Sequence, residues 1–480
     1  MRRASRKSST SSLRLSVTPL EAVLSAPRAR LSLTTGRPLD IGDVRVVLFT
    51  TLWARSQGGQ VVSRPDGSTA LEDLRWLRLE PDPSLSAGRK ARCQAVAEEL
   101  LARGQAYPCF CTPAELREMY TQQASSDGQV RYDGRCRRLS VSDIEALRKA
   151  GRHPCVRLHT PEAAFDVTDA QGHTTHIAPG DLDDFRLMLN DGNPSDVFGD
   201  LVDDHEGEAT LVLWSAARRP ELPQRAVLAR VLGWQVAPVA FLADWHGPDG
   251  KTPVFEGQVL TLSALRTLGY HPKAILRLAA AAGWDPGDDL DLDAMAARFH
   301  LDAVSDAVPP FELPRLRAEN ASVLKRISED DLVASMVDHL DRRGYPMSER
   351  EPAWQRRFVA AVLPEMETLA DAESMAALLL TPTVDYDREV ARTLREPATQ
   401  ALVTQFEAAM VGVDSHNVES WRDVLTRFRA GSAAPGRALA TLRLVLTGQR
   451  AGPNLPALLS LLGIEGCRAR IEKARRYAGS

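Results

Sequence analysis

The pattern of apolar residues changes at about residue 310, and this change constrains the fold more than any other feature of the chain. Before that point, short apolar runs alternate with amphipathic segments, as in an α/β domain. Within 29–59 we expect a strand, a glycine-containing loop and a helix, and we expect another short helix over 181–189. One side of the first helix should carry Val44, Val47, Leu48, Thr51 and Leu52. After residue 310 helical periodicity dominates, so we predict an all-α C-terminal third.

Length and composition narrow the class of protein. A chain of 480 residues suggests roughly three domains at about 100–200 residues each. Apolar residues make up 44% and charged residues 25%, which excludes collagen-like and wholly disordered chains. No apolar run reaches the length of a membrane span, so we expect no membrane contact. The six sparse cysteines favour reduced thiols and a cytoplasmic protein, and we expect a monomer. The net charge of −4 excludes a polycation that coats nucleic acid, and any RNA contact therefore needs a local basic face.

The first 28 residues form a basic, serine-rich tail without an acidic residue before Glu21. The cations before Glu21 are Arg2, Arg3, Arg6, Lys7 and Arg14. Three interpretations remain open. The tail is disordered, it results from an upstream start codon, or it targets the protein to an organelle.

Seven segments together form a pattern that is far more specific than one short motif. They are AVAEELLARGQAYPCFCTPAEL, RYDGRCR, DLDDFRLMLNDGNP, LVDDHEGEATLV, RAVLARVLGW, LGYHPKAILRLAAAAGW and LRLVLTGQRAGPNLPALLSLLG. In this order, from about Ala29 to Tyr477, they resemble bacterial-type glutamyl-tRNA synthetases. These class I enzymes activate glutamate with ATP and load it onto tRNA. The resemblance implies ATP and Mg²⁺ as cofactors and tRNA as a partner.

The resemblance also implies a domain order that agrees with the apolar pattern. A Rossmann-like α/β catalytic domain is split by an acceptor-stem-binding insertion and followed by all-α anticodon-binding domains. We therefore predict a tail over 1–28, a Rossmann-like domain over 29–92 and 186–310, an insertion over 93–185, a helical junction over 311–375 and a helical anticodon-binding domain over 376–480.

The two ATP motifs of the family are degraded in this chain. Where the family has His-Ile-Gly-His, this sequence has Asp40 in place of the first histidine, and Gly42 alone is kept. A carboxylate beside a polyphosphate is repulsive. The family's second motif is a Lys-Met/Leu-Ser-Lys loop, whereas here Lys251 precedes the motif position and no second lysine follows. These changes argue against the use of ATP and Mg²⁺, since each lost charge-stabilising donor costs about 10²–10³ in rate.

The residues that should recognise glutamate are also changed. Leu31–Gly36 stands where the family has Ala-Pro-Ser-Pro-Thr-Gly, with Arg30 just upstream. Asp196 replaces a tyrosine, and Trp214 replaces an arginine that should bind a substrate carboxylate. An indole donor cannot replace a bidentate guanidinium. Arg218, four residues after Trp214, is a remaining cation.

These losses gather where ATP and glutamate should bind, which indicates a divergent paralogue with a decayed or repurposed active site. Our first hypothesis is a glutamyl-tRNA synthetase-like protein that binds tRNA, or a protein partner, without standard aminoacylation. The second is an active ligase that uses displaced residues such as Lys251, Arg218 or Arg219. The third is a protein-interaction module that has lost RNA binding.

A candidate zinc site is better preserved. Cys109 and Cys111 on a turn, followed by Tyr132 and Cys136, resemble the site in the insertion of zinc-containing members. Thiolates one residue apart can both reach one tetrahedral Zn²⁺. Arg138 stands where some members have a histidine ligand, which leaves Tyr132 as the fourth candidate. The alternative is a small core of three reduced cysteines.

The C-terminal segment is rich in arginines that are candidates for phosphate contacts with tRNA. We expect these contacts from Arg437, Arg443, Arg450, Arg468, Arg470, Arg475 and Arg476. A solvated helix face is the alternative for any one of them.

Overall fold

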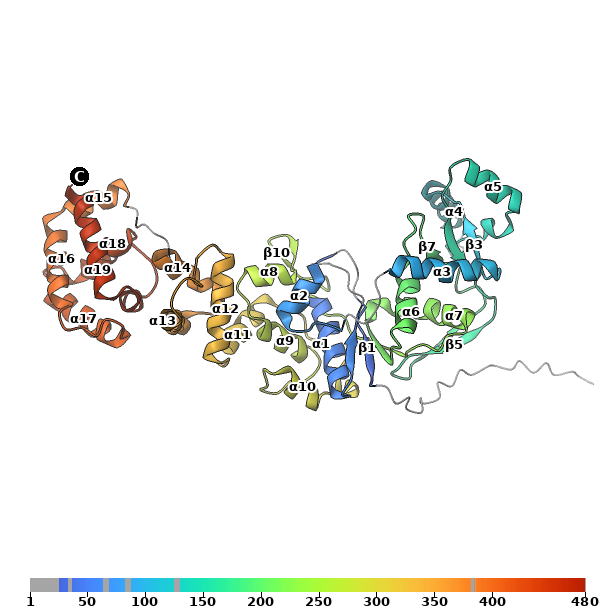
Figure 1. The fold of residues 1–480 in the computed structure, drawn as a ribbon, viewed down its shortest axis with the longest axis horizontal. Coiled ribbons are helices and arrows are strands. Elements are labelled where there is room, and N and C mark those ends of the chain that lie inside the picture. Colours follow the sequence, from blue (N-terminus) through green and yellow to red (C-terminus); the bar gives the residue numbers. More distant parts are fainter. Residues whose placement is uncertain are drawn as a thin grey trace, which may run out of the picture. The chain divides into compact units, whose positions relative to one another are not determined.

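The computed structural model describes residues 26–32, 37–63, 69–82, 88–124, 130–380, 384 and 386–479. The chain divides into two compact units (Figure 1). The first comprises Met1–Leu262 and Ala279–Phe311, and the second Ser263–Leu278 and Glu312–Ser480. Most of the predicted tail, residues 1–25, lies outside the described residues. The first strand begins at Arg28, one residue before the predicted domain boundary.

A four-stranded parallel sheet forms the centre of the first unit. Its strands are β1 (Arg28–Arg30), β2 (Gln60–Val62), β8 (Leu211–Ser215) and β9 (Val239–Leu242), in the order β2-β1-β8-β9. Ala29 pairs with Val61 on one side and with Leu211 on the other. The next strand in sequence, β2, lies on one side of β1, and β8 lies on the other. Such sheets bind ligands in the crevice at this reversal of strand order, which the carboxyl ends of β1 and β8 border.

The predicted helix after β1 is confirmed as α1 (Ile41–Ser56), which packs against β1, β2 and β8. All five apolar-face residues predicted for it are buried. On its other side α1 contacts α10 (Leu292–Arg298), and the rings of Phe49 and Phe299 stack at 5.5 Å. The sheet unit also contains α2 (Thr69–Leu77), α6 (Asp196–Glu206), η2 (Ala216–Glu221), α7 (Leu222–Leu232) and η3 (Leu301–Ala303).

A smaller region with its own antiparallel sheet is inserted between β2 and α6. Its helices are α3 (Arg89–Ala102), α4 (Pro113–Ala124), η1 (Arg135–Arg138) and α5 (Val141–Lys149). Its sheet has the order β3-β4-β7, formed by β3 (Ala106–Cys109), β4 (Cys155–Leu158) and β7 (Arg186–Met188). A separate hairpin joins β5 (Phe165–Thr168) to β6 (Thr174–Ile177). One core joins Val96 and Leu100 of α3 to Phe198 and Leu201 of α6.

The predicted helix over 181–189 is wrong, because this segment ends in strand β7. Val156 of β4 pairs with Met188, which satisfies backbone groups that a helix would have paired internally. The carboxylates before the strand also accept backbone N–H groups of other segments: Asp183 from Tyr132 at 3.1 Å and Asp184 from Thr160 at 3.0 Å. Tertiary pairing therefore overrides the local pattern.

The C-terminal unit is helical, as predicted. Among the described residues, no strand follows the short hairpin of β10 (Val254–Phe255) and β11 (Gln258–Val259). The helices that follow are α8 (Leu262–Thr267), α9 (Pro272–Ala281), α11 (Leu313–Leu324), α12 (Glu329–Arg342), α13 (Pro352–Val362), η4 (Leu363–Glu365), η5 (Leu369–Ala372), α14 (Glu373–Leu380), α15 (Arg388–Arg395), α16 (Pro397–Ala409), α17 (Val418–Gly431), α18 (Pro435–Thr447) and α19 (Leu455–Gly479).

The core of this unit includes Phe358, Phe406 and Trp421, each fully buried. α19 contains a break at Gly463, whose φ of 66° is left-handed. None of the described helices combines the length and the apolar character needed to cross a membrane.

Candidate functional site

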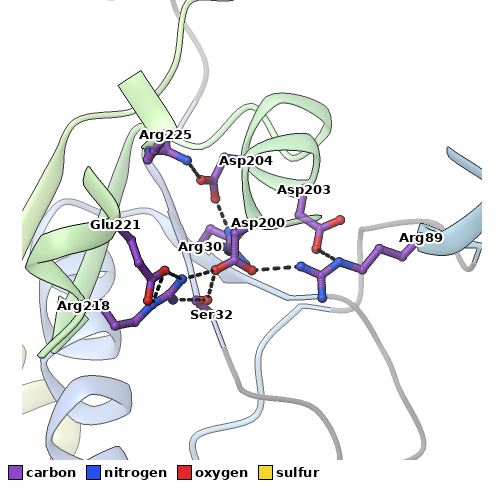
Figure 2. A network of polar contacts seen from close by, with 9 residues as sticks. All are labelled: Arg30, Ser32, Arg89, Asp200, Asp203, Asp204, Arg218, Glu221 and Arg225. Carbon is purple, nitrogen blue, oxygen red and sulfur yellow. Dashed lines mark hydrogen bonds and ion pairs between the residues drawn. The ribbon is translucent and has the colours of Figure 1, made fainter. Parts of the chain in front are cut away.

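Four arginines and four carboxylates meet at the carboxyl ends of β1 and β8 (Figure 2). The cations are Arg30, Arg89, Arg218 and Arg225, and the anions are Asp200, Asp203, Asp204 and Glu221. We call these eight residues the crevice network. Since the crevice of a parallel sheet is its usual ligand site, the network stands where a substrate would bind.

The deepest part of the network surrounds Asp204, whose side chain is 0% exposed. Arg30, the last residue of β1, donates to Asp204 and lies 3.4 Å from Asp200. Arg225 of α7 binds the other oxygen of Asp204 and donates to the carbonyl of Ala237 at 3.1 Å. Burial alone would lower the pKa of Arg30, but Asp204 and Asp200 outweigh it and raise that pKa above its ordinary value. Arg30 is therefore held as a buried cation whose charge is compensated by two carboxylates.

Arg218 closes the network on the side of β8. Its guanidinium donates to Ser32 at 2.9 Å, to Asp200 at 2.9 Å and to Glu221 at 2.6 Å. Its Cζ atom also lies 4.1 Å from the ring centroid of Trp214, which is 1% exposed. Stacking on an aromatic face is a favoured arrangement for arginine. The N–H groups of Arg218 therefore donate to residues of the protein itself.

Arg89 brings the inserted region into the network. Its Nη2 atom lies 2.9 Å from Asp200 and its Nε atom 3.1 Å from Asp203. A Cβ atom at Gly199 would lie 2.5 Å from the Arg89 Nη2 atom. Glycine at position 199 is therefore what lets Arg89 pass so close to the backbone of α6.

The charges of the crevice network balance, so none of its arginines is left for a substrate carboxylate. Burial alone would raise the pKa of Asp200, yet Arg30, Arg218 and Arg89 outweigh burial and hold that pKa well below its ordinary value. Removing one partner from such a group leaves an unpaired buried charge, which costs several kcal/mol. A carboxylate ligand would have to displace an internal carboxylate to gain an arginine.

The N-terminus of α1 is likewise filled by the protein's own carboxylates. Asp40 is the N-cap, and its Oδ1 atom accepts N–H groups of Gly42 at 2.9 Å and Asp43 at 3.2 Å. Asp43 accepts the N–H of Asp40 in return, and Arg37 pairs with Asp40 at 3.1 Å and Asp43 at 2.7 Å. Burial and the neighbouring Asp40 raise the pKa of Asp43. The N–H groups that bind phosphate at helix N-termini are therefore occupied.

The loop that carries Lys251 returns to the same place. Leu262 donates to the carbonyl of Leu39 at 2.9 Å, and Thr261 forms a bridge with Asp40. Lys251 is exposed, and its backbone N–H donates a hydrogen bond to the side chain of Asp249 at 3.1 Å. Asp196 is also exposed, in the first turn of α6 and outside the crevice network. Of the predicted substrate residues, the structure brings together Arg30, Trp214 and Arg218, while Leu33–Gly36 lies outside the described residues.

The four predicted zinc ligands converge in the inserted region. The sulfur atoms of Cys109, Cys111 and Cys136 all lie within 4.8 Å of one another, and those of Cys111 and Cys136 are 3.6 Å apart. The Tyr132 hydroxyl lies 3.4 Å from the Cys109 sulfur and 3.8 Å from that of Cys111. Ligands of one tetrahedral zinc lie roughly 3.8 Å apart, so this donor set fits the metal.

Two further residues belong to this cluster. Cys155 pairs with Cys109 in the ladder of β3 and β4, and the guanidinium of Arg157 lies 3.8 Å from the ring centroid of Tyr132. Hydrogen bonds from Cys136 and Cys155 lower the pKa of Cys109 far below that of an ordinary thiol. A sulfur atom at this position is therefore ready to bind a cation as thiolate.

The predicted tRNA-binding arginines have different kinds of partners. Several hold the fold together: Arg443 donates to the carbonyl of Pro453 at 2.6 Å, and Arg470 to those of Leu446 at 2.8 Å and Leu378. Others form ion pairs, Arg450 with Glu389 at 2.6 Å, Arg475 with Glu407 at 2.5 Å and Arg476 with Glu472 at 3.5 Å. Arg437 and Arg468 are exposed.

A pocket of about 660 Å³ lies between α17, α18 and the start of α19. Four arginines line it, Arg422, Arg429, Arg443 and Arg450. Leu425, Leu439, Ala440, Leu455, Pro435 and Pro456 supply apolar walls. We call this the arginine pocket. Its combination of guanidinium groups and apolar surface suits a phosphate with an unstacked base.

Family comparison decides what kind of protein carries these sites. The model of "tRNA synthetases class I (E and Q), catalytic domain" matches residues 34–311, and "Anticodon binding domain" matches residues 331–475. The chain belongs to this class I tRNA synthetase family. Glutamate–tRNA ligase of Geobacillus stearothermophilus is 26% identical over 91% of this chain and 96% of its own length. That of Heliobacterium modesticaldum is 28% identical over 94% and 97%.

Solved structures agree on the fold. A glutamate tRNA ligase from Elizabethkingia meningosepticum, determined in complex with its amino acid, has a TM-score of 0.66 at 22% identity. It covers 94% of this chain and 99% of its own. The Elizabethkingia anophelis enzyme has a TM-score of 0.64 at 21% identity, over 94% and 100%. The predicted class I fold with a helical anticodon-binding part is therefore confirmed.

Most residues of the crevice network were not predicted from the sequence. Asp200, Asp203 and Asp204 share one face of α6 at spacings of three and four residues, which is a visible signal for paired carboxylates. Their arginine partners come from distant segments and leave no comparable local pattern. Cys155, which packs beside Cys109, Cys111 and Cys136, and the pocket residues Arg422 and Arg429 were not predicted as site residues.

Proposed function

We propose that this protein is a glutamate–tRNA ligase-like protein that binds tRNA but does not activate glutamate with ATP. The observation that carries the proposal is the crevice network, in which every arginine is neutralised by a carboxylate of the protein itself. Substrate recognition needs preorganised donors that are free to meet the ligand. In this protein the arginine donors are already held by carboxylates of the protein, so they are not free to meet a substrate.

The charges around the ATP position support the same proposal. Asp40 and Asp249 lie on the loops that the family uses for the triphosphate, and Asp43 lies in the first turn of α1. The nearby cations are Arg37, which pairs with Asp40 and Asp43, and the exposed Lys251. Since Arg37 is already paired with two carboxylates, little positive charge remains for a polyphosphate. An active ligase with displaced residues is the second candidate, and it depends on Lys251 or Arg218 meeting a substrate.

We propose that tRNA binding uses the arginine pocket. Arg422 and Arg450 are paired only at the surface, with Glu419 at 2.8 Å and Glu389 at 2.6 Å. Such exposed pairs contribute only about 0–1 kcal/mol, so a phosphate can replace the carboxylate at little cost. Arg429 lines the same pocket. Arg443 instead supports the pocket wall through the Pro453 carbonyl.

Changing Arg422, Arg429 and Arg450 together to glutamine is expected to weaken tRNA binding and flatten its dependence on salt. Each lost phosphate contact should lower the slope of log affinity against log salt by about 0.7–0.9. Fluorescence anisotropy across salt concentrations measures both effects. The matched control changes the exposed Arg326, Arg342 and Arg356 to glutamine. Equal affinity of the unmodified protein for tRNA and for random single-stranded RNA would favour the protein-interaction hypothesis instead.

We also propose that Cys109, Cys111, Tyr132 and Cys136 hold one structural Zn²⁺. A metal in this position would tie the end of β3 and the loop after it to η1 and so stabilise the insertion. We expect one zinc ion per chain in protein that is purified without chelator. Inductively coupled plasma mass spectrometry measures this zinc content.

Cys111→Ser should lower the zinc content and the stability of the insertion. Cys467→Ala, which changes a buried cysteine of the helical unit, should leave the zinc content at one. A zinc content near zero in the unmodified protein would leave only the small core of reduced thiols.

A further inference from the structure

The loop that carries two of the four zinc donors is tied down at both ends by neighbouring aspartates. At its start, the N–H of Tyr132 donates to Asp183 at 3.1 Å. At its end, Arg137, the residue after Cys136, donates through Nε and Nη2 to the two carboxylate oxygens of Asp184. Both aspartates precede β7, far from the loop in sequence. The loop is therefore shaped by a segment that contributes no donor to the metal.

Asp184 also reaches the strand that carries the other donors. Its side chain is 1% exposed and accepts the hydroxyl of Tyr107, which lies two residues before Cys109 on β3. The N–H of Thr160 donates to the same carboxylate at 3.0 Å. One carboxylate thus joins β3, η1 and the chain after β4.

The backbone of the same residue holds the cation beside the donors. The carbonyl of Asp184 accepts Nη1 of Arg157 at 2.5 Å, and the guanidinium of Arg157 lies 3.8 Å from the Tyr132 ring centroid. Arg157 is 4% exposed. Three thiolates around a divalent metal carry a net negative charge, and a buried guanidinium compensates it.

We propose that Asp184 is the positioning residue of the metal centre: it preorganises the two donor segments and the compensating Arg157. This inference rests on the zinc site proposed above. The donors come from two segments about twenty residues apart, so without a clamp the second segment must be ordered when the metal binds. Outer groups that orient metal ligands typically affect affinity by about 10- to 100-fold.

Asp184→Asn keeps the size of the side chain but removes the charge that binds Arg137. Zinc affinity of the full-length protein, measured by competition with a chromophoric chelator, should fall about 10- to 100-fold. Arg137→Gln should have a similar effect, and the double variant should be little worse than either single one, because both act through the same contact. Cobalt(II) in place of zinc should show an altered tetrahedral absorption spectrum in Asp184→Asn.

Two controls separate positioning from general loss of stability. Leu187→Ala removes a fully buried side chain of β7 and should destabilise the fold without changing zinc affinity. Asp181→Asn changes an exposed carboxylate of the same segment that accepts the N–H of Ala178 at 2.6 Å, and it should leave affinity unchanged.

If Asp184→Asn had the same zinc affinity and the same cobalt spectrum as the unmodified protein, the positioning role would be overturned and the metal centre would remain. A fall in affinity in Leu187→Ala as large as that in Asp184→Asn would also overturn it. An unmodified protein that takes up no zinc would remove the metal centre and the positioning role together.

Discussion

Replacing Asp204 with asparagine is expected to lower the free energy of unfolding of the sheet unit by about 3–5 kcal/mol. The side chains of Asp204, Arg30 and Arg225 are 0%, 3% and 2% exposed, so water cannot compensate either arginine. Arg225 would keep only the Ala237 carbonyl, and Arg30 would keep only Asp200 at 3.4 Å. The penalty comes from uncompensated buried charge. Urea denaturation followed by tryptophan fluorescence measures it.

The matched control is Glu99→Gln, which breaks the ion pair between Glu99 of α3 and Arg103. Both of these side chains are about half exposed. Its expected effect lies within about 0.5 kcal/mol, as for other exposed pairs on a helix. If Asp204→Asn were as mild as Glu99→Gln, the crevice would be open to water. The crevice network would then be neither tightly packed nor shielded from water.

The same network predicts the direction of acid sensitivity. The pKa of Asp200 is held below its ordinary value, so its contribution to stability is complete above the unfolded pKa of about 3.9. That contribution is lost as the pH falls below this value towards the folded pKa. Unfolding midpoints measured between pH 7 and pH 3 should therefore decline towards the acid end.

The sequence pattern predicted well those elements whose signal is local. The apolar face of α1 is one case, because helical spacing of Val44, Val47 and Leu48 already requires a buried side. The four converging candidate zinc donors are another, since only one residue separates Cys109 from Cys111 and Tyr132 and Cys136 are four residues apart. The absence of strand patterns after residue 310 likewise predicted the helical unit.

Features that depend on distant partners were not predictable. Strand β7 forms because β4 offers it an open edge, and its own residues alone favoured a helix. Arg89, Asp204 and Arg225 meet only after the insertion and the sheet are assembled. The sequence predicted changed substrate residues, whereas the ion pairs inside the crevice could be described only from the structure. The arginine pocket also needs helices α17, α18 and α19 to pack together.

Restoring single residues of the family motifs is not expected to restore activation. Asp40→His would remove the N-cap of α1, and Trp214→Arg would place another guanidinium beside Arg218, whose Cζ atom already lies 4.1 Å from the ring of Trp214. Neither change supplies the missing lysine after Lys251 or frees an arginine of the crevice network. Each absent charge-stabilising donor costs about 10²–10³ in rate, so the combined loss should reach several orders of magnitude.

Amino-acid-dependent ATP–pyrophosphate exchange, run over all twenty amino acids with the unmodified full-length protein, tests the absence of activation most directly. A glutamate–tRNA ligase from one of the curated relatives, assayed beside it, provides the positive control. The expected result is no exchange above the background without amino acid, while the same preparation binds tRNA in a salt-dependent manner. Exchange with glutamate, or with any other amino acid, at a turnover of the order of 1 s⁻¹ or faster would contradict the proposed function and identify the protein as an active ligase.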